Sequence, residues 1–211
     1  MTGLHRHALV WLSQVPEADD ESDRQRAEQW HVDGRPFVVC RRRGERGEVS
    51  LGFCAVHEKF PEIRPRRIGA HALAAQVVRM AEPPVLAEVA RCGPAVGHAS
   101  AFARLADGAA VAGLDLRVYG SWMWQTLTGE RHVRPSSDLD LFVPVAGPRE
   151  AENAAAFLEG QEAALPFKLD GELSFPGVGE VQWREYRLGA PEVLLKTVDT
   201  VRMIRREELR P

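Results

Sequence analysis

Gly120-Ser121 begins the most informative part of this chain. After a gap of about the length of a helix, it is followed by Ser137-Asp138-Leu139-Asp140-Leu141. The turn stands between residues 114–119 (LDLRVY), an apolar-alternating run, and residues 122–129 (WMWQTLTG), which have helical apolar spacing. The pattern predicts a strand, a tight turn and a helix. Glycine lets the backbone approach a ligand closely, Ser121 can cap the helix, and the free amides of its first turn favour an anion such as phosphate.

Two acids open the next expected strand, residues 138–145 (DLDLFVPV). Successive side chains of a strand point to opposite faces, so Asp138 and Asp140 share one face while Leu139 and Leu141 take the other. Like charges this close repel each other unless a cation lies between them, and hard carboxylate oxygens suit Mg²⁺ or Mn²⁺. The sequence therefore predicts a metal site at the two acids, of the kind used in phosphoryl or nucleotidyl transfer.

This pattern resembles the nucleotidyltransferase superfamily that includes the DNA polymerase beta type. Within it, the runs VYGSWMWQTLTG and SSDLDLFV and the downstream DGELSF, VQWREY and VLLKT are similar to the malonate decarboxylase holo-acyl-carrier-protein synthase family, also called phosphoribosyl-dephospho-CoA transferase. The resemblance covers most of the chain, since GRPFVVCRRR and LGF near the N-terminus are also similar to that family. It implies an α+β fold and a transferase that uses Mg²⁺ or Mn²⁺.

A two-metal site needs a third carboxylate, which helps to hold the catalytic cation and to draw the proton from the attacking hydroxyl. The resemblance places this acid on the strand after the second helix, and Asp170 is our choice there. Glu172 shares that strand face by the two-residue period and is the runner-up, with Glu180 or Glu185 as further alternatives.

Two arginine clusters in the first part of the chain are candidates for substrate binding. Arg41 and Arg43 stand in the triple run that closes an expected strand, and Arg67 belongs to the proline-interrupted segment PEIRPRRIG. Guanidinium groups form paired hydrogen bonds with phosphate and carboxylate oxygens. Either cluster therefore suits a polyphosphate or an acidic protein.

Three residues of the second half carry separate expectations. Arg134 stands in the loop just before the acids and is expected close to the substrate. Lys196 is expected on the closing helix. The resemblance of VLLKT implies that it is a further phosphate ligand. His132 lies in the same loop as Arg134 and is expected to be a solvated histidine.

The composition suits a compact enzyme and argues against several other classes. With 211 residues, 45% of them apolar, the chain can bury a sizeable core in one large or two small domains. The net charge of −3 argues against a general nucleic-acid binder, whose domains carry a strong positive excess. Neither an apolar run of about 18 residues nor an export signal is found, so we expect no membrane association and a cytoplasmic location.

The chain is expected to divide near Pro83-Pro84. Residues 1–82 are expected to form a small α+β domain that binds substrate or partner, with strands at 36–43 and 49–56. Residues 83–211 are expected to form a catalytic nucleotidyltransferase domain, with a mixed sheet flanked by helices. Beyond the elements already given, its expected helices are at 85–92, 100–114, 149–163 and about 191–207, and its expected strands are near 167–175 and 180–187.

The resemblance also implies a specific reaction. Its donor is 2′-(5″-triphosphoribosyl)-3′-dephospho-CoA, and its acceptor is a serine hydroxyl of the apo acyl-carrier subunit of malonate decarboxylase, with pyrophosphate as leaving group. Gly120 and Ser121 would orient the leaving phosphates. Two alternatives stay open: a nucleotidyltransferase that uses an ordinary nucleoside triphosphate, and a noncatalytic nucleotide-binding module, which the intact Asp138 and Asp140 disfavour.

Overall fold

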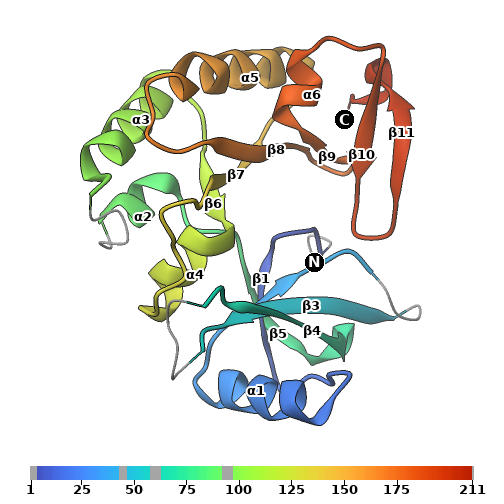
Figure 1. Ribbon diagram of the computed structural model, residues 1–211. Coiled ribbons are helices and arrows are strands. Elements are labelled where there is room, and N and C mark those ends of the chain that lie inside the picture. Colours follow the sequence, from blue (N-terminus) through green and yellow to red (C-terminus); the bar gives the residue numbers. More distant parts are fainter. Residues whose placement is uncertain (1–3, 43–46, 58–62, 92–96, 211) are drawn as a thin grey trace. The chain divides into compact units, whose positions relative to one another are not determined.

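The computed structural model describes residues 4–42, 47–57, 63–91 and 97–210 (Figure 1). The chain divides into two compact units. The first contains Met1–Glu82 and Glu130–His132, and the second contains Pro83–Gly129 and Val133–Pro211. Helices and two sheets are present in the described part of the chain, and the α+β fold class is confirmed. No helix among these described residues is long and apolar enough to cross a membrane.

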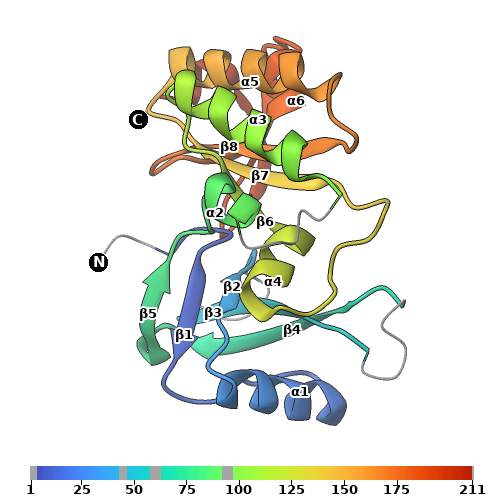
Figure 2. The same cartoon turned by 90° about the vertical axis from the view of Figure 1, so that its left-hand side faces the viewer.

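The first unit is an antiparallel sheet with the helix α1 along one of its sides (Figures 1 and 2). Its described strands are ordered β4-β3-β2-β1-β5. The elements are β1 (Leu9–Leu12), α1 (Glu21–Val32), β2 (Phe37–Val39), β3 (Glu48–Ala55), β4 (Arg66–Leu73), the 3-10 turn η1 (Ala74–Gln76) and β5 (Val77–Ala81). The expected strand at 36–43 is therefore shorter than predicted, and the proline-interrupted segment leads into a strand that was not predicted.

Aromatic packing and an ion pair fix α1 to this sheet. Trp30 of α1 is buried against Phe53 of β3, with ring centroids 5.0 Å apart, and Phe37 meets Phe53 edge-on at 5.5 Å. At the other end of the helix, Arg66 of β4 donates a hydrogen bond of 2.7 Å to Asp23. Such aromatic pairs add to the free energy gained from burial, so α1 has one defined position on the sheet.

The second unit is a mixed sheet, ordered β11-β10-β9-β8-β7-β6 in the described residues. β7 and β8 run parallel and are connected through α5, whereas the other paired strands are antiparallel. The elements are α2 (Leu86–Arg91), α3 (Ala99–Val111), β6 (Arg117–Tyr119), α4 (Gly120–Thr128), β7 (Leu139–Pro144), α5 (Pro148–Glu162), β8 (Leu169–Phe175), β9 (Gly179–Gln182), α6 (Trp183–Arg187), β10 (Glu192–Lys196), β11 (Val201–Arg205) and the 3-10 turn η2 (Arg206–Glu208).

Helices cover one face of the mixed sheet. Figures 1 and 2 both show α3 and α5 over the same side of β7 and β8. Leu139 and Leu141 of β7 and Leu169 and Leu173 of β8 are fully buried. Successive side chains of a strand point to opposite faces, so Asp140, Asp170 and Glu172 belong to the other face, together with the buried Phe142.

Two predictions for the C-terminal part are wrong. The expected closing helix at about 191–207 is a hairpin of β10 and β11, because Thr197 forms the turn between them. Its amide donates to the Thr200 carbonyl at 2.8 Å, and its hydroxyl accepts from the Thr200 amide at 2.9 Å. The strand expected at 180–187 ends at Gln182, because the Gln182 side chain accepts hydrogen bonds from the first amides of α6. Hydroxyl and amide side chains thus interrupt the apolar periodicity of this region.

The expectation of a solvated His132 is also wrong, because His132 is buried. It belongs to the first unit together with Glu130. Burial lowers the pKa of His132 below its ordinary value of 6.5, although the Glu130 carboxylate, 3.6 Å from Nε2, opposes the shift. The folded protein therefore favours neutral His132.

This burial predicts a pH-dependent stability. As the pH falls below about 6.5, the unfolded chain takes up a proton at His132 that the folded chain resists, so the free energy of unfolding should fall. The variant His132→Gln should lack this part of the pH dependence. Denaturant titrations of both proteins between about pH 7.5 and about pH 5 measure it. A stability difference between them that stays constant over that range would contradict the assignment.

Candidate active site

Asp138 and Asp140 lie on the polar side of β7. Asp138 directly precedes the strand and is exposed, whereas Asp140 is its second residue and is half-buried. Leu139 and Leu141, between and after them, are fully buried on the other side. The two carboxylates therefore belong to the face of the sheet opposite the apolar core.

Asp170 is the direct neighbour of Asp140 in the sheet. The parallel register of β7 and β8 pairs Asp140 with Asp170 and Phe142 with Glu172. Neighbouring strands lie about 4.8 Å apart, and residues paired in a parallel register point to the same face. Asp140 and Asp170 are thus adjacent carboxylates on one face, brought together from segments that are separated by a whole helix.

Gly120 lies against the Asp140 carboxylate. Tyr119, the residue before Gly120, pairs with Asp140 in the sheet. The helix α4 begins immediately after Tyr119. Gly120 has a φ of 70°, and a Cβ at this position would lie 2.0 Å from the Asp140 Oδ2 atom. Only glycine therefore allows the helix to begin so close to the acid.

Ser121 does not cap α4, contrary to the sequence-based expectation. The N-cap residue is Tyr119, and no side chain caps the helix there. Ser121 lies in the first turn and is half-buried. The helix ends at Gly129 in the left-handed conformation, as its sequence suggests.

Two buried tryptophans hold the backbone beside the acids. The Trp122 indole Nε1 donates to the carbonyl of Asp138 at 3.1 Å, and the Trp183 Nε1 donates to the carbonyl of Leu169 at 3.3 Å. Leu169 directly precedes Asp170. Neither contact is predicted by the sequence, because an indole that binds a backbone carbonyl leaves no signal in local periodicity.

The start of β8 has further anchors. Arg184 of α6 donates to the Leu169 carbonyl at 2.6 Å and also bonds to the Glu162 carboxylate. Glu162 at the end of α5 accepts from the Leu169 amide at 3.1 Å. Both backbone groups of Leu169 are therefore bound by side chains of the helices, and this fixes the residue before Asp170.

The Asp170 carboxylate is oriented by its own strand and the next one. Its Oδ1 atom accepts hydrogen bonds from the Gly171 amide at 2.8 Å and from the Gln182 side chain at 3.2 Å. These two donors hold the carboxylate in one orientation.

Lys196 lies at the end of β10 and not on a helix. Its Nζ atom is 2.7 Å from the Glu172 Oε1 atom, and it is paired in register with Glu180 of β9. Both Glu172 and Glu180 are buried. Glu172, the runner-up for the third acid, therefore has a lysine as its partner, in contrast to Asp170.

The arginines predicted to bind substrate occupy different parts of the chain. Arg134 is exposed in a turn closed by hydrogen bonds with Ser137, directly before Asp138. Arg41 is exposed beyond the end of β2, and Arg67 is exposed near the start of β4, so both belong to the first unit. Arg43 lies outside the described residues.

The carboxylates have the right donor chemistry for a divalent cation, but they are not arranged as a preformed cage. Asp138, Asp140 and Asp170 supply hard oxygens from one sheet face, which suit Mg²⁺ or Mn²⁺. Within the described ranges, however, no group of three or more His, Cys, Asp or Glu side chains forms a ligand set. The residue types therefore suit a divalent cation, for which the described side chains supply only part of a ligand set.

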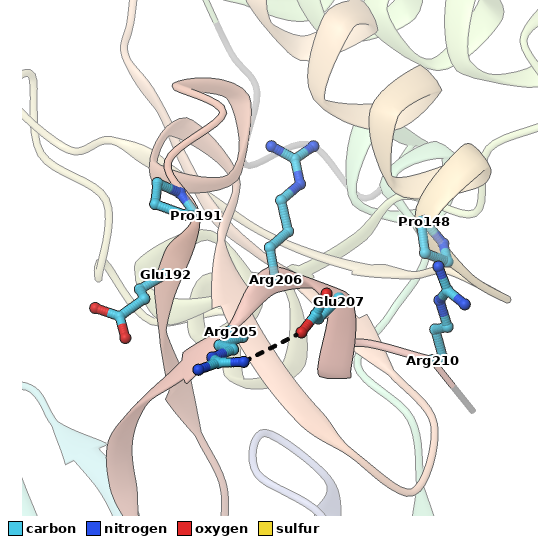
Figure 3. Close-up of a pocket in the computed structure, with 7 residues that line it drawn as sticks. All are labelled: Pro148, Pro191, Glu192, Arg205, Arg206, Glu207 and Arg210. Carbon is cyan, nitrogen blue, oxygen red and sulfur yellow. Dashed lines mark ion pairs between the residues drawn. The ribbon is translucent and has the colours of Figure 1, made fainter.

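A separate hollow of about 620 Å³ lies in the second unit, around β11 and the start of α5. Figure 3 shows Arg205 paired with Glu207 at its edge, at 3.6 Å, while Arg210 lies beside Pro148. Arg206 stacks on the Tyr186 ring, 4.0 Å from its centroid, and donates to its carbonyl. None of the acids or glycine described above lines this hollow.

The fold and the site together define a class of protein: an α+β protein with adjacent carboxylates on one face of a mixed sheet, beside a glycine that begins a helix. Family comparison gives the particular family. Residues 85–207 match the C-terminal domain of phosphoribosyl-dephospho-CoA transferase MdcG, and residues 5–83 match its N-terminal domain. The chain belongs to the phosphoribosyl-dephospho-CoA transferase family.

Curated relatives agree with this assignment over nearly the whole chain. A phosphoribosyl-dephospho-CoA transferase of Xanthomonas euvesicatoria pv. vesicatoria (strain 85-10) is 35% identical over 210 residues, 98% of this chain and 96% of the relative. One of Xanthomonas campestris pv. campestris (strain 8004) is 34% identical with the same coverage. One of Azotobacter vinelandii (strain DJ / ATCC BAA-1303) is 29% identical over 202 residues, 94% of this chain and 91% of the relative. No solved structure matches the chain.

The contact between Gly120 and Asp140 gives a prediction with a matched control. Gly120→Ala and Gly129→Ala both place alanine at a φ near 70°, which should cost about 1 to 2 kcal/mol of unfolding free energy in each case. A Cβ at Gly129 meets no atom within 4 Å, whereas a Cβ at Gly120 displaces Asp140. Gly120→Ala should therefore lose roughly 100-fold in transferase rate, and Gly129→Ala should not. Equal rates in the two variants would show that the transfer reaction does not depend on the space that Gly120 leaves for the Asp140 carboxylate.

The Glu172–Lys196 pair should contribute to stability more than a surface pair does. A double-mutant cycle of Glu172→Gln and Lys196→Met, followed by urea unfolding, should give a coupling energy of about 1 to 3 kcal/mol because Glu172 is buried. The exposed pair Arg187–Glu159, at 2.8 Å, is the control and should couple by less than about 1 kcal/mol. A coupling no larger than that of the control would mean that the pair is only a solvated contact.

Proposed function

We propose that this chain transfers the phosphoribosyl-dephospho-CoA group of 2′-(5″-triphosphoribosyl)-3′-dephospho-CoA to a serine of the apo acyl-carrier subunit of malonate decarboxylase, with release of pyrophosphate. Membership of the transferase family supports the transferred group. The observation that carries the proposed chemistry is the alignment of Asp140 with Asp170 beside Gly120. Adjacent carboxylates on one sheet face suit a reaction at a polyphosphate.

In the proposed reaction, the serine oxygen attacks the phosphorus nearest the ribose. A new oxygen–phosphorus bond forms, the bond from that phosphorus to the bridging oxygen of pyrophosphate breaks, and the serine proton passes to a carboxylate. Asp170 is our choice for the carboxylate that receives the proton, because its Oδ1 atom is oriented by Gly171 and Gln182. The product is a phosphodiester on the carrier subunit.

Asp138, Asp140 and Asp170 would hold Mg²⁺ or Mn²⁺. A bound cation supplies charge neutralisation for the triphosphate and for the attacking and leaving oxygens. The Trp122 and Trp183 hydrogen bonds hold the backbone at Asp138 and next to Asp170, so these acids keep their positions while the substrate binds.

Basic and backbone groups would orient the phosphates. The Gly120 amide and Ser121 stand at the start of α4, where the helix dipole favours negative charge. Arg134 belongs to the turn that leads into Asp138, and Lys196 contacts Glu172 on the sheet face of the acids. We assign Arg41, Arg43 and Arg67 to the triphosphate or to acidic groups of the carrier, since guanidinium forks match both.

Intact mass spectrometry of the carrier subunit tests the proposal. Incubation of the apo carrier with this protein, Mg²⁺ and the triphosphoribosyl donor should add the mass of one phosphoribosyl-dephospho-CoA group and release pyrophosphate. A parallel reaction with ATP as donor should add nothing. Absence of the added mass would refute this donor and acceptor, and labelling from ATP would favour a transferase that uses ordinary nucleoside triphosphates.

Variants of Asp138 and Asp140 test whether these carboxylates take part in the transfer reaction. Asp138→Asn and Asp140→Asn should each lower the transfer rate by roughly 100-fold or more, because they remove charge from the site where phosphate charge must be neutralised. Asp107→Asn is the control, since Asp107 is exposed on α3 and belongs to the helices of the other face. Unchanged rates in the first two variants would refute the catalytic assignment.

The third acid is tested by the same assay. Asp170→Asn should lower the rate by roughly 100-fold or more, as expected for loss of a proton acceptor. Glu172→Gln should have a smaller effect, because Glu172 contacts Lys196. The reverse order would make Glu172 the third carboxylate.

A further inference from the structure

A pocket of about 610 Å³ lies within the first unit, between α1 and the end of β3. One face of α1 forms a wall of it, because its lining residues recur at helical spacing: Ser22, Gln25, Arg26, Gln29 and Trp30, with Asp33 directly after the helix. This volume falls within the range of small-molecule sites, about 300 to 1,000 Å³. None of the acids assigned to catalysis lines it.

The pocket has an apolar base and a polar rim. Trp30 and Phe53 are both buried and pack against each other. The exposed Gln25 and Gln29 side chains stand along α1 above them. Each of them also makes one contact at its own helix: Gln25 Nε2 donates to the Glu21 carboxylate at 3.2 Å, and Gln29 Nε2 donates to the Asp33 carboxylate at 2.7 Å. Amide side chains carry both donors and acceptors, which suits the edge of a planar heteroaromatic ring.

The charged groups of the pocket differ in their partners. Arg35 is held by two carboxylates, Asp33 at 3.3 Å and Glu130 at 2.8 Å, and its guanidinium lies 4.9 Å from the Trp30 ring centroid. Arg26 is half-buried and makes no hydrogen bond or ion pair with any residue in the described part of the chain. The Arg35 charge is therefore neutralised inside the pocket, while the Arg26 charge is available for a ligand.

These features match a nucleotide: a planar base that carries hydrogen-bonding edges, joined to an anionic phosphate. A free guanidinium is a strong phosphate partner, and a single such group next to an apolar base suits one phosphate better than a long polyphosphate. We propose that the α1 pocket binds the adenosine 5′-phosphate part of the CoA-type donor, with Arg26 on the phosphate. This inference rests on the donor proposed above.

Calorimetric titration of the full chain with 3′-dephospho-CoA tests this site. Arg26→Gln should weaken binding by about tenfold or more, as expected for loss of one charged hydrogen bond. Arg24→Gln is the matched control, because Arg24 is on the same helix, is exposed, pairs with Glu21 and does not line the pocket. Thermal unfolding of both variants checks that the helix is retained.

Competition identifies the part of the ligand that is recognised. AMP should displace 3′-dephospho-CoA, and 4′-phosphopantetheine should not. Equal affinity of wild type and Arg26→Gln, no binding of 3′-dephospho-CoA to wild type, or displacement by 4′-phosphopantetheine but not AMP would each overturn the proposal.

The same variants separate this inference from the proposed function. Asp140→Asn should lower the rate of carrier labelling by roughly 100-fold or more and still bind 3′-dephospho-CoA in an Arg26-dependent manner. If the wild type labels no carrier but binds 3′-dephospho-CoA through Arg26, the pocket stands and the proposed acceptor falls. If the carrier is labelled while Arg26→Gln binds 3′-dephospho-CoA as wild type does, the transfer reaction stands and the pocket assignment is wrong.

Discussion

β7 and β8 run parallel, and this pairing requires the backbone of Gly171 to pass so close to Leu141 that a Cβ would lie 2.4 Å from its carbonyl oxygen. Any other residue would push the two strands apart or shift their register. Because a one-residue shift would turn every side chain to the other face, the approach of Gly171 also decides that Asp140 stands beside Asp170. The candidate site and the apolar core beneath it depend on this one contact between strands.

The rest of the site is fixed mainly through the backbone. Gly120 allows α4 to begin against Asp140, and Trp122 and Trp183 hold carbonyl groups at Asp138 and next to Asp170. Buried indoles lose little freedom when they bind, so they keep the acids in place without neutralising their charge. The acids beside these anchors are thus positioned through the backbone.

The C-terminal segment and His132 differ from what their local sequence patterns predict. Residues 191–207 have apolar spacing that fits a helix, but Thr197 and its hydroxyl make a hairpin turn, and Val193 and Ile204 are buried on paired strands. The difference between helix and hairpin matters for Lys196, because the hairpin places it beside Glu172. His132 was misjudged for a similar reason, because its burial comes from its place in the first unit and not from its neighbours in the chain.

The sequence by itself determined the Gly120-Ser121 turn, the alternation that puts Asp138 and Asp140 opposite Leu139, and the α+β class, since each follows from spacing over a few residues. It also favoured Asp170, through a resemblance and not through geometry. Only the tertiary structure decided that Asp170 pairs with Asp140 and that Lys196 pairs with Glu172. These pairings join segments that are far apart in the chain, and their register is set by long-range packing that no local pattern encodes.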